Sequence, residues 1–351
     1  MTAWSPIHAR VHQTLRSRQQ SRLLPQGSRI LVAVSGGQDS MTLLRLLIDL
    51  QPHWGWQLRV VHGDHRWRSD AAANAEFVGE VATAWGVPWE IAVADPIPAS
   101  EAAAREWRYR TFGQIARQHH CLHLAVGHTA SDRAETLLYN LVRGSGADGL
   151  QALGWQRSLS PDHPELTLVR PLLDLTRAQT ADFCTQHQIP TWPDPTNADR
   201  AYARNRIRLD LLPLLRSHLN PRADLTLAHT AELLTAEVEF LETEASALAQ
   251  RCVDTHTHTL DRALLQASPL ALQRRVLRQV LQHIMGQPPH FDHVEKLIHL
   301  ISAPHRSQTD PFPGGAIAYV DRDRIRWHPP PGKSSADESG SECVDGSEAD
   351  R

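Results

Sequence analysis

Residues 30–47, ILVAVSGGQDSMTLLRLL, read as a buried strand, a polar turn with two adjacent glycines, and an amphipathic helix. From Arg29 to about Leu173, similar strand-like runs alternate with helical patterns. This alternation indicates a parallel sheet with helices on both faces, because parallel strands need a crossover connection between them. We therefore expect an α/β fold that binds its ligands at the carboxyl ends of the strands.

Five strands and five helices are expected in this region, each from an apolar run or from apolar residues at three-and-four spacing. The expected strands are residues 29–34, 58–62, 89–94, 122–127 and 166–172. The expected helices are residues 40–49, 71–85, 100–119, 132–143 and 176–189. The loops at 35–40, 62–68 and 127–132 each follow a strand, so they should converge on one crevice.

The length and the later sequence indicate more than one domain. A chain of 351 residues can hold one domain of about 200 residues and a smaller one. We expect a catalytic domain over residues 1–215 and a smaller helical accessory domain over residues 216–328. The second region has the periodicity of amphipathic helices and contains no catalytic motif of its own. Residues 329–351 should form a disordered acidic tail, because they are too poor in apolar side chains to order themselves.

Charge and cysteine content exclude several classes of protein. The formal net charge of −3 excludes a uniformly basic coat for nucleic acid, so any RNA contact must be a local patch. The cysteines, Cys121, Cys184, Cys252 and Cys343, are scattered without a C-x-x-C pair, which argues against a disulfide framework or a zinc ribbon. No stretch approaches the ~20 apolar residues of a membrane span. We expect a soluble cytoplasmic protein.

The turn at residues 35–40 has the composition of a phosphate cradle. Glycines let the backbone approach an anion, the following helix points N–H groups at it, and two serine hydroxyls can donate. An aspartate beside a polyphosphate calls for a divalent cation between them, so we assign Asp39 to Mg²⁺. The expected nucleotide ligands are Ser35, Gly36, Gly37, Gln38, Asp39 and Ser40. The alternative is a capped strand-to-helix turn that binds nothing.

SGGQDS after an apolar strand resembles the S-G-G-x-D-S loop of the N-type ATP pyrophosphatases, the PP-loop family, which adenylate a carbonyl-type oxygen and release pyrophosphate. The resemblance implies ATP as cosubstrate and a Rossmann-like sheet of the adenine nucleotide alpha hydrolase type. The loop alone does not distinguish the members of this family, which include GMP synthetase, tRNA thiolation enzymes and lysidine synthases.

Five further segments resemble the lysidine synthases, in order along the chain. They are VVHGDHRWRSDAAANAEFV, EAAAREWRYRTF, AVGHTASDRAETLLYNLVRGSG, LVRPLLDLTRAQT and WPDPTNADRAYARNRIRLDLLPLL. Thr129, Ser131 and Arg133 depart from the third pattern, where the family has His, Asp and Gln.

The resemblance implies a ligase reaction on a transfer RNA. ATP would adenylate O2 of the wobble cytidine in the CAU anticodon of tRNA(Ile), and pyrophosphate would leave. The ε-amine of free L-lysine would then attack C2 and release AMP, forming lysidine and changing the codon read from AUG to AUA.

The resemblance also assigns roles to residues. Arg105 and Arg108, three apart on a helix, would reach a phosphate or the flipped cytosine together. Asp132 and Glu135 share a helix face and would bind lysine and help deprotonate it. The remaining assignments are Asp64, His65 and His128 for the nucleotide and Arg204, Asn205, Arg206 and Arg208 for tRNA. We expect the accessory domain at residues 216–328 to bind tRNA as well.

Simpler interpretations stay open for several of these residues. Asp132 and Glu135 suit the first turn of any helix because of its dipole. The arginines at 204–208 could instead close the domain through salt bridges to Asp194 or Asp199. At the level of function, a tRNA cytidine thiolation enzyme would need cysteines at a cluster or persulfide position, and a non-catalytic module would only sense ATP.

Overall fold

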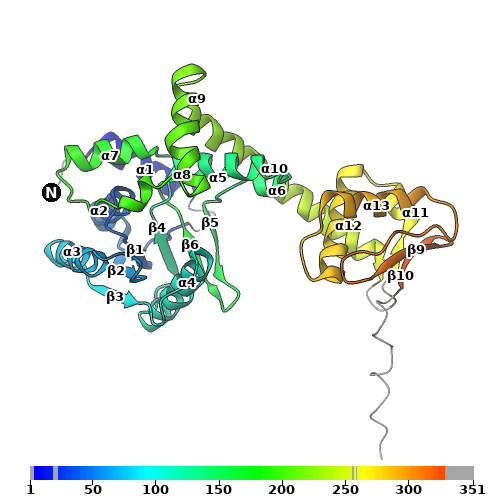
Figure 1. The fold of residues 1–351 in the computed structure, drawn as a ribbon. Helices are drawn as coiled ribbons and strands as arrows, with labels where there is room; N and C mark the ends of the chain where they lie inside the picture. The colour runs from blue at the N-terminus through cyan, green and yellow to red at the C-terminus, as the bar shows by residue number, and fades with distance from the viewer. Residues whose placement is uncertain (1–3, 19–22, 255–256, 258, 329–351) are drawn as a thin grey trace, which may run out of the picture. The chain divides into compact units, whose positions relative to one another are not determined.

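In the computed structural model, the alternating segments form a six-stranded sheet in the order β3-β2-β1-β4-β6-β5 (Figure 1). The strands are β1 (Arg29–Ala33), β2 (Gln57–Asp64), β3 (Trp89–Val93), β4 (His123–Val126), β5 (Gln156–Ser160) and β6 (His163–Val169). The strands β3, β2, β1, β4 and β6 run parallel to their neighbours in the sheet, whereas the edge strand β5 pairs antiparallel with β6. The expected strands and the α/β class are confirmed. The edge strand β5, QRSLS, was not predicted because it carries little apolar character.

The structure describes residues 4–18, 23–254, 257 and 259–328, and the expected tail at 329–351 lies outside the described residues. The helices up to residue 252 are α1 (Pro6–Ser17), α2 (Gln38–Trp54), α3 (Ala71–Ala84), α4 (Glu101–Gln118), α5 (Ala130–Val142), α6 (Ala147–Leu150), α7 (Arg177–Gln186), α8 (Ala203–Arg206), α9 (Leu212–His218) and α10 (Ala223–Cys252), with the 3-10 turn η1 (Pro195–Ala198) and the π-helical turn η2 (Ile207–Leu211). Helix α2 continues past the expected end at residue 49 and stops at Gly55, which adopts a left-handed conformation with φ of 65°.

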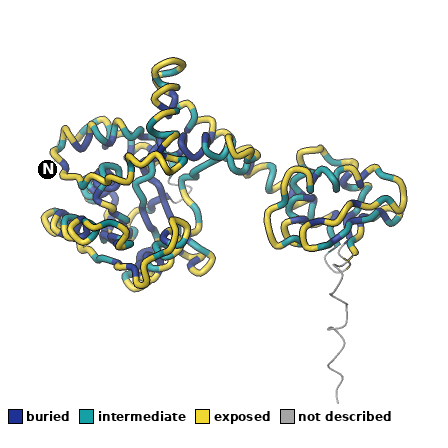
Figure 2. The backbone as a smooth tube through the Cα atoms, viewed as in Figure 1, coloured by how far each residue is buried: buried dark blue, intermediate teal, exposed yellow. Residues whose placement is uncertain are grey.

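Alternation along β1 explains why helices cover both faces of the sheet. Ile30 and Val32 point into a core shared with α1, α2, α3 and α7, whereas Leu31 points into a second core shared with α4. Figure 2 shows these central strands as buried backbone within the first part of the chain. A parallel sheet buried on both faces must read as a continuous apolar run, which is the pattern of residues 30–34.

Contacts between residues divide the chain into two units, Met1–Ala236 and Glu237–Arg351. The second unit contains α11 (Arg262–Gln266), α12 (Leu270–Met285) and α13 (Phe291–Ser302), as expected for a helical region. It also contains a four-stranded antiparallel sheet, which was not predicted, formed by β7 (Val253–Asp254), β8 (Thr259–Asp261), β9 (Ile317–Asp321) and β10 (Arg324–His328). Its core includes Leu277 and Leu297 from the helices and Ile325 from the sheet. Among the described residues, no helix has the length and apolar character of a membrane span.

The end of β4 packs directly on the start of α2. A Cβ atom added to Gly127, the residue after β4, would lie 2.9 Å from the backbone C and O of Asp39 and from the backbone N of Ser40. Backbone atoms cannot rotate out of the way as a flexible side chain can. The close approach of these two segments therefore requires glycine at this position.

We predict that Gly127→Ala lowers the free energy of unfolding by about 2 kcal/mol, because the extra methyl group overpacks two backbone segments. Gly146→Ala is the matched control, since no atom lies within 4 Å of its added Cβ and its φ is −70°. Urea unfolding followed by circular dichroism measures both. Equal stability of the two variants would contradict the proposed crowding.

Candidate functional site

The loops after β1, β2 and β4 meet around a cavity of about 400 Å³, as the position of these loops predicted. This volume suits a small ligand. Twelve of the predicted site residues line it: Ser35, Gly37, Gln38, Asp39, Ser40, His65, Arg105, Arg108, His128, Asp132, Arg204 and Arg208. The predicted residues Gly36, Asp64, Glu135, Asn205 and Arg206 are absent from its lining.

The turn between β1 and α2 presents the start of a helix to this cavity. Gly36 has φ of 87°, a left-handed conformation that glycine adopts without strain, and Gly37 is the N-cap of α2. The Ser40 hydroxyl donates to the Gly37 carbonyl at 2.9 Å and lies 3.2 Å from the Ser35 hydroxyl. Hydroxyls and the N–H groups of a helix start therefore face the same space, which is the arrangement of an anion site.

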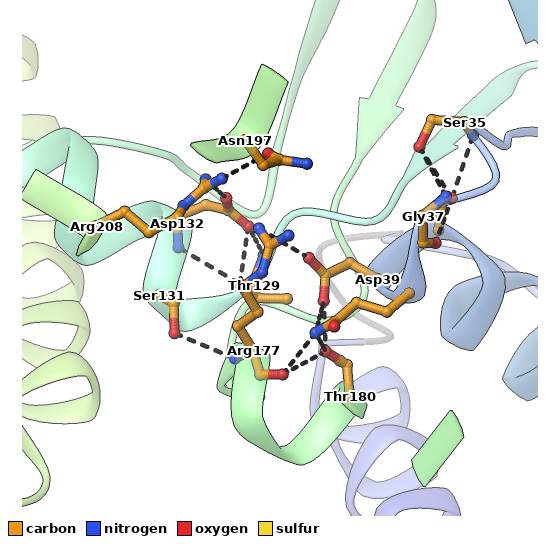
Figure 3. A network of polar contacts seen from close by, with 12 residues as sticks. Ser35, Gly37, Asp39, Thr129, Ser131, Asp132, Arg177, Thr180, Asn197 and Arg208 are labelled. Atoms are coloured by element: carbon orange, nitrogen blue, oxygen red, sulfur yellow. Dashed lines mark hydrogen bonds and ion pairs between the residues drawn. The ribbon is translucent and has the colours of Figure 1, made fainter. Parts of the chain in front are cut away.

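Asp39 lies at the floor of the cavity, where Thr180 donates a hydrogen bond to it and Arg177 approaches its carboxylate at 3.6 Å (Figure 3). Burial raises the pKa of Asp39 above its ordinary value, and the neighbouring carboxylate of Asp132 raises it further. Two carboxylates close together in a buried site favour a cation between them. The donor set therefore fits Mg²⁺, which typically binds one or two carboxylates together with phosphate oxygens.

Asp132 and Glu135 occupy different environments although they share the first turns of α5. Asp132 Oδ2 accepts hydrogen bonds from the backbone N–H and the hydroxyl of Thr129, both at 2.8 Å, and so caps the helix. Glu135 is only 3% exposed, and both of its oxygens accept hydrogen bonds from Arg208, at 2.7 and 2.8 Å. Asp132 thus faces the cavity, whereas Glu135 lies beneath Arg208.

Arg208 joins three segments of the chain. Besides its bonds to Glu135, it approaches Asp132 Oδ1 at 3.4 Å and donates to the side-chain oxygen of Asn197 at 3.0 Å (Figure 3). The guanidinium therefore balances the two carboxylates of α5 and holds the segment after α7 beside them.

The two histidines of the cavity are neutral at neutral pH. Burial, together with the neighbouring Arg108, lowers the pKa of His65 to about 4. Burial likewise lowers the pKa of His128 to about 4, and Arg170 donates a hydrogen bond to its Nδ1 at 3.2 Å. Both rings can form hydrogen bonds to a ligand, but neither supplies positive charge to a phosphate. Asp64 lies behind them and accepts a hydrogen bond from the backbone N–H of Arg66 at 2.7 Å, as an ordinary strand-end turn does.

Arginines supply the positive charge of the cavity. Arg105 and Arg108 come from α4, where Arg105 lies over the Tyr109 ring at 5.2 Å. Burial lowers the pKa of Arg108, yet the ordinary value for arginine is so high that the side chain stays charged at neutral pH. Arg204 contributes from α8.

The remaining predicted tRNA ligands bind the protein itself. Asn205 donates to the carbonyl oxygens of Thr196 and Asp199, at 2.9 and 2.7 Å. Arg206 donates to the carbonyl oxygens of Arg200 and Ala201, at 3.0 and 3.1 Å. These two residues stabilise the segment that closes the catalytic unit, although through carbonyls rather than through the salt bridges considered from sequence.

The residues that depart from the family pattern have structural partners in this chain. Thr129 is the N-cap of α5, and the hydroxyl of Ser131 accepts a hydrogen bond from the backbone N–H of Arg177 at 3.1 Å. Arg133 is 2% exposed and donates to Glu232 at 2.7 Å. The departures therefore change how α5 is held and add no group to the cavity lining.

Several functional side chains were not predicted as site residues. Arg177, Trp192, Asp194 and Asn197 line the cavity but belong to segments that follow the sheet in sequence. Arg177 stands in the LVRPLLDLTR segment and the others in WPDPTNADR, so the resemblance contained them without giving them a role.

A family model described as a PP-loop domain matches residues 6–215, more than half of the 351 residues, and one described as a TilS substrate binding domain matches residues 260–326. The fold and the site are thus those of a PP-loop protein with a second, substrate-binding region. The chain is 53% identical to the tRNA(Ile)-lysidine synthase of Nostoc sp., covering 90% of this chain and 95% of that relative. It is 47% identical to the tRNA(Ile)-lysidine synthase of Synechocystis sp., covering 93% and 98%. The chain belongs to the tRNA(Ile)-lysidine synthase family, as its motifs indicated.

A solved structure supports the fold. The U34-tRNA thiolase NcsA from Methanococcus maripaludis, determined with its 4Fe-4S cluster, is 16% identical and superposes with a TM-score of 0.53 over 65% of this chain and 78% of that chain. At this identity the likeness concerns the fold alone.

We predict that Arg208→Ala destabilises the protein by about 3 kcal/mol, because it leaves the buried Glu135 carboxylate without its partner. The exposed neighbour Arg204 serves as control, and Arg204→Ala should change stability by less than about 0.5 kcal/mol. A double variant, Arg208→Met with Glu135→Leu, should recover much of the loss because neither charge of this pair stays buried without its partner. Urea unfolding of the three variants measures these differences, and equal losses for Arg208→Ala and Arg204→Ala would contradict the assignment.

Proposed function

We propose that this protein joins free L-lysine to C2 of the wobble cytidine in the CAU anticodon of tRNA(Ile), using ATP and releasing AMP and pyrophosphate. The observation that carries the proposal is one cavity whose lining combines a phosphate loop, the carboxylates of Asp39 and Asp132, and several arginines. The high identity to named tRNA(Ile)-lysidine synthases over nearly their whole length supports the same substrate. Such a reaction forms a carbon–nitrogen bond and belongs in the cytoplasm, where tRNA and ATP occur.

In the first step, O2 of the cytidine attacks the α-phosphorus of ATP, and the bond from that phosphorus to the β-phosphate bridging oxygen breaks. The leaving pyrophosphate lies against the helix start formed by Gly37 to Ser40, whose N–H groups and hydroxyls stabilise its charge. Arg105 and Arg108 hold the cytosine or the phosphates from the opposite wall. Neutral His65 and His128 supply hydrogen bonds to the nucleotide.

Asp39, with Asp132 beside it, is the proposed holder of Mg²⁺. When bound, the cation supplies charge neutralisation for the triphosphate. The protein's own contribution is the placement of Asp39, which Thr180 and Arg177 hold toward the cavity.

In the second step, the lysine ε-nitrogen attacks C2, the C2–O2 bond breaks, and AMP leaves with the former O2. The amine is protonated in water at neutral pH, so it must lose a proton before it attacks. Asp132 and Glu135 remain the proposed carboxylates for this step, with separate tasks. Asp132 faces the cavity and would receive the ammonium, whereas Glu135 would act by holding Arg208.

Recognition of tRNA is proposed for Arg204, Asn205, Arg206 and Arg208 together with the second unit. Arg204 lies at the cavity and is exposed, so it is the member of this set best placed for a phosphate. The family model for a substrate-binding domain covers most of the second unit outside α10. There Arg274, Arg275 and Arg278 already pair with Glu295 or Glu242, which favours a structural role for these three arginines.

A thiolation reaction fits the site less well. The described cysteines, Cys121, Cys184 and Cys252, are buried, and none of the three lines the cavity. Within the described part of the chain, no group of three or more His, Cys, Asp or Glu side chains is arranged to hold a metal ion by itself.

We predict that the full chain, incubated with ATP, radiolabelled lysine and tRNA(Ile) bearing CAU, transfers the label to the RNA. A tRNA in which uridine replaces the wobble cytidine is the control and should stay unlabelled. Label in both RNAs, or in neither while ATP is consumed, would overturn the proposed substrate.

We predict that Asp39→Asn reduces tRNA-dependent exchange of pyrophosphate into ATP about 100-fold or more, because the variant lacks the carboxylate that would hold the cation in this cavity. The same change should leave the unfolding midpoint unchanged or raise it, since folding places the Asp39 charge in a buried site that raises its pKa. Asp162→Asn, at an exposed turn, is the control. Wild-type exchange by Asp39→Asn would place the cation elsewhere.

A further inference from the structure

Two consecutive carbonyl groups of the phosphate loop are bonded from outside the loop. Asn74 Nδ2, on α3, donates to the carbonyl oxygen of Ser35 at 3.1 Å, and the backbone N–H of Trp192 donates to the carbonyl oxygen of Gly36 at 2.8 Å. In a trans peptide, the carbonyl and the following N–H point in opposite directions. Both bonds therefore turn the N–H groups of Gly36 and Gly37 away from Asn74 and Trp192.

The two glycines of the loop have different surroundings. A Cβ atom on Gly36 would lie 2.5 Å from Asn74 Oδ1 and 3.2 Å from Trp192 Cβ, so these two residues pack against Gly36, which is absent from the cavity lining, while another part of Trp192 reaches the cavity. Gly37, in contrast, lines the cavity at the start of α2, where Figure 3 shows it beside Ser35. The N–H group of Gly37 is thus turned to the side of the cavity, where it makes a long hydrogen bond of 3.5 Å to the Ser35 hydroxyl that also lines the cavity.

The amide of Asn74 is oriented for this one bond. Its Oδ1 is buried and has no hydrogen-bond partner among the described residues, and this arrangement costs stability. Rotating the amide by half a turn would place its oxygen against the Ser35 carbonyl oxygen, so the amino group must face the loop. A side chain that served only to fill space would not need this donor.

Trp192 is itself held by residues next to Asn74 in sequence. Its indole Nε1 donates to Asp70 Oδ2 at 3.0 Å. Arg68 binds Asp70 through two nitrogens, one at 2.7 Å, and reaches Asp194 at 3.0 Å. Residues 68–74, which had no assigned role beyond their resemblance to a family segment, thus fasten the segment at 192–194 against the back of the phosphate loop.

We propose that Asn74 and Trp192 are positioning residues for the nucleotide, which set the directions of the loop N–H groups before ATP binds. Donors that are already oriented lose less freedom on binding, so they bind a phosphate more tightly than donors that must first rotate. The inference rests on the proposed ATP site and adds to it the residues that prepare that site.

The test compares binding of a non-hydrolysable ATP analogue, with Mg²⁺, to the full chain by isothermal titration calorimetry. Asn74→Leu keeps a similar volume and removes the donor, and it should weaken the analogue about fivefold or more, the factor that corresponds to one hydrogen bond of about 1 kcal/mol. Val81→Ala, a buried change on the same helix away from the loop, controls for lost stability and should leave the affinity unchanged. In the lysine transfer assay, Asn74→Leu should raise KM for ATP and leave KM for lysine as in the wild type.

A second variant separates positioning from packing. Asn74→Asp places a carboxylate against the Ser35 carbonyl, so the analogue should bind more weakly than to the wild type at neutral pH. Lowering the pH protonates the introduced carboxyl, which can then donate to Ser35, so the affinity relative to the wild type should recover.

Each outcome decides a different claim. If the wild type does not bind the analogue, the proposed function and this inference both fall. If the wild type binds the analogue and both Asn74 variants bind it as tightly as the wild type at every pH, the inference alone is overturned and Asn74 only fills space. Weaker binding by Asn74→Leu with recovery of Asn74→Asp on acidification establishes the positioning role.

Discussion

The site depends on how a buried region accommodates several carboxylates. Asp39, Asp132 and Glu135 come from two helices that start at the same edge of the sheet, and like charges this close oppose folding. Arg208 offsets the charge of Glu135 with two hydrogen bonds, and Arg177 lies near Asp39. These arginines come from segments late in the catalytic unit, so the site is complete only when residues 177–208 fold back over the sheet. The charge balance of the site therefore joins the late segments that carry Arg177 and Arg208 to the helices that carry the carboxylates, one of which directly follows the first strand.

The phosphate loop, in contrast, must present hydrogen-bond donors to a negatively charged ligand. There the protein offers hydroxyls and N–H groups, and the charged side chains that line the same cavity include Asp39, Arg177 and the arginines of α4. A triphosphate placed between these walls would meet donors on one side and cations on the other. His65 and His128, whose pKa values burial lowers to about 4, line the same cavity without adding positive charge to it at neutral pH.

The sequence predicts best what depends on local pattern. The run at 30–34 gave the central strand, because a strand buried on both faces is apolar throughout, and SGGQDS gave the turn that follows it. The edge strand β5 and the C-terminal sheet were missed because short, half-exposed strands lack that pattern. In the site, Asp39 was assigned from its neighbours in sequence. The contacts of Asn74 with Ser35 and of Arg208 with Glu135 join residues 39 and 73 positions apart, and no local spacing reports such a contact.

Asp132 combines two tasks in one carboxylate, since Oδ2 closes the capping box of α5 and Oδ1 is directed toward Arg208 and the cavity. A substitution that lacks a side-chain oxygen removes the capping-box partner of Thr129 and alters the cavity at the same time. A survey of variants scored by cell growth would therefore report a single intolerant residue and conceal two independent causes. Asp132→Asn keeps the side-chain shape and an oxygen that can still accept from Thr129 while it removes the charge, so this replacement separates the chemical role from the folding role.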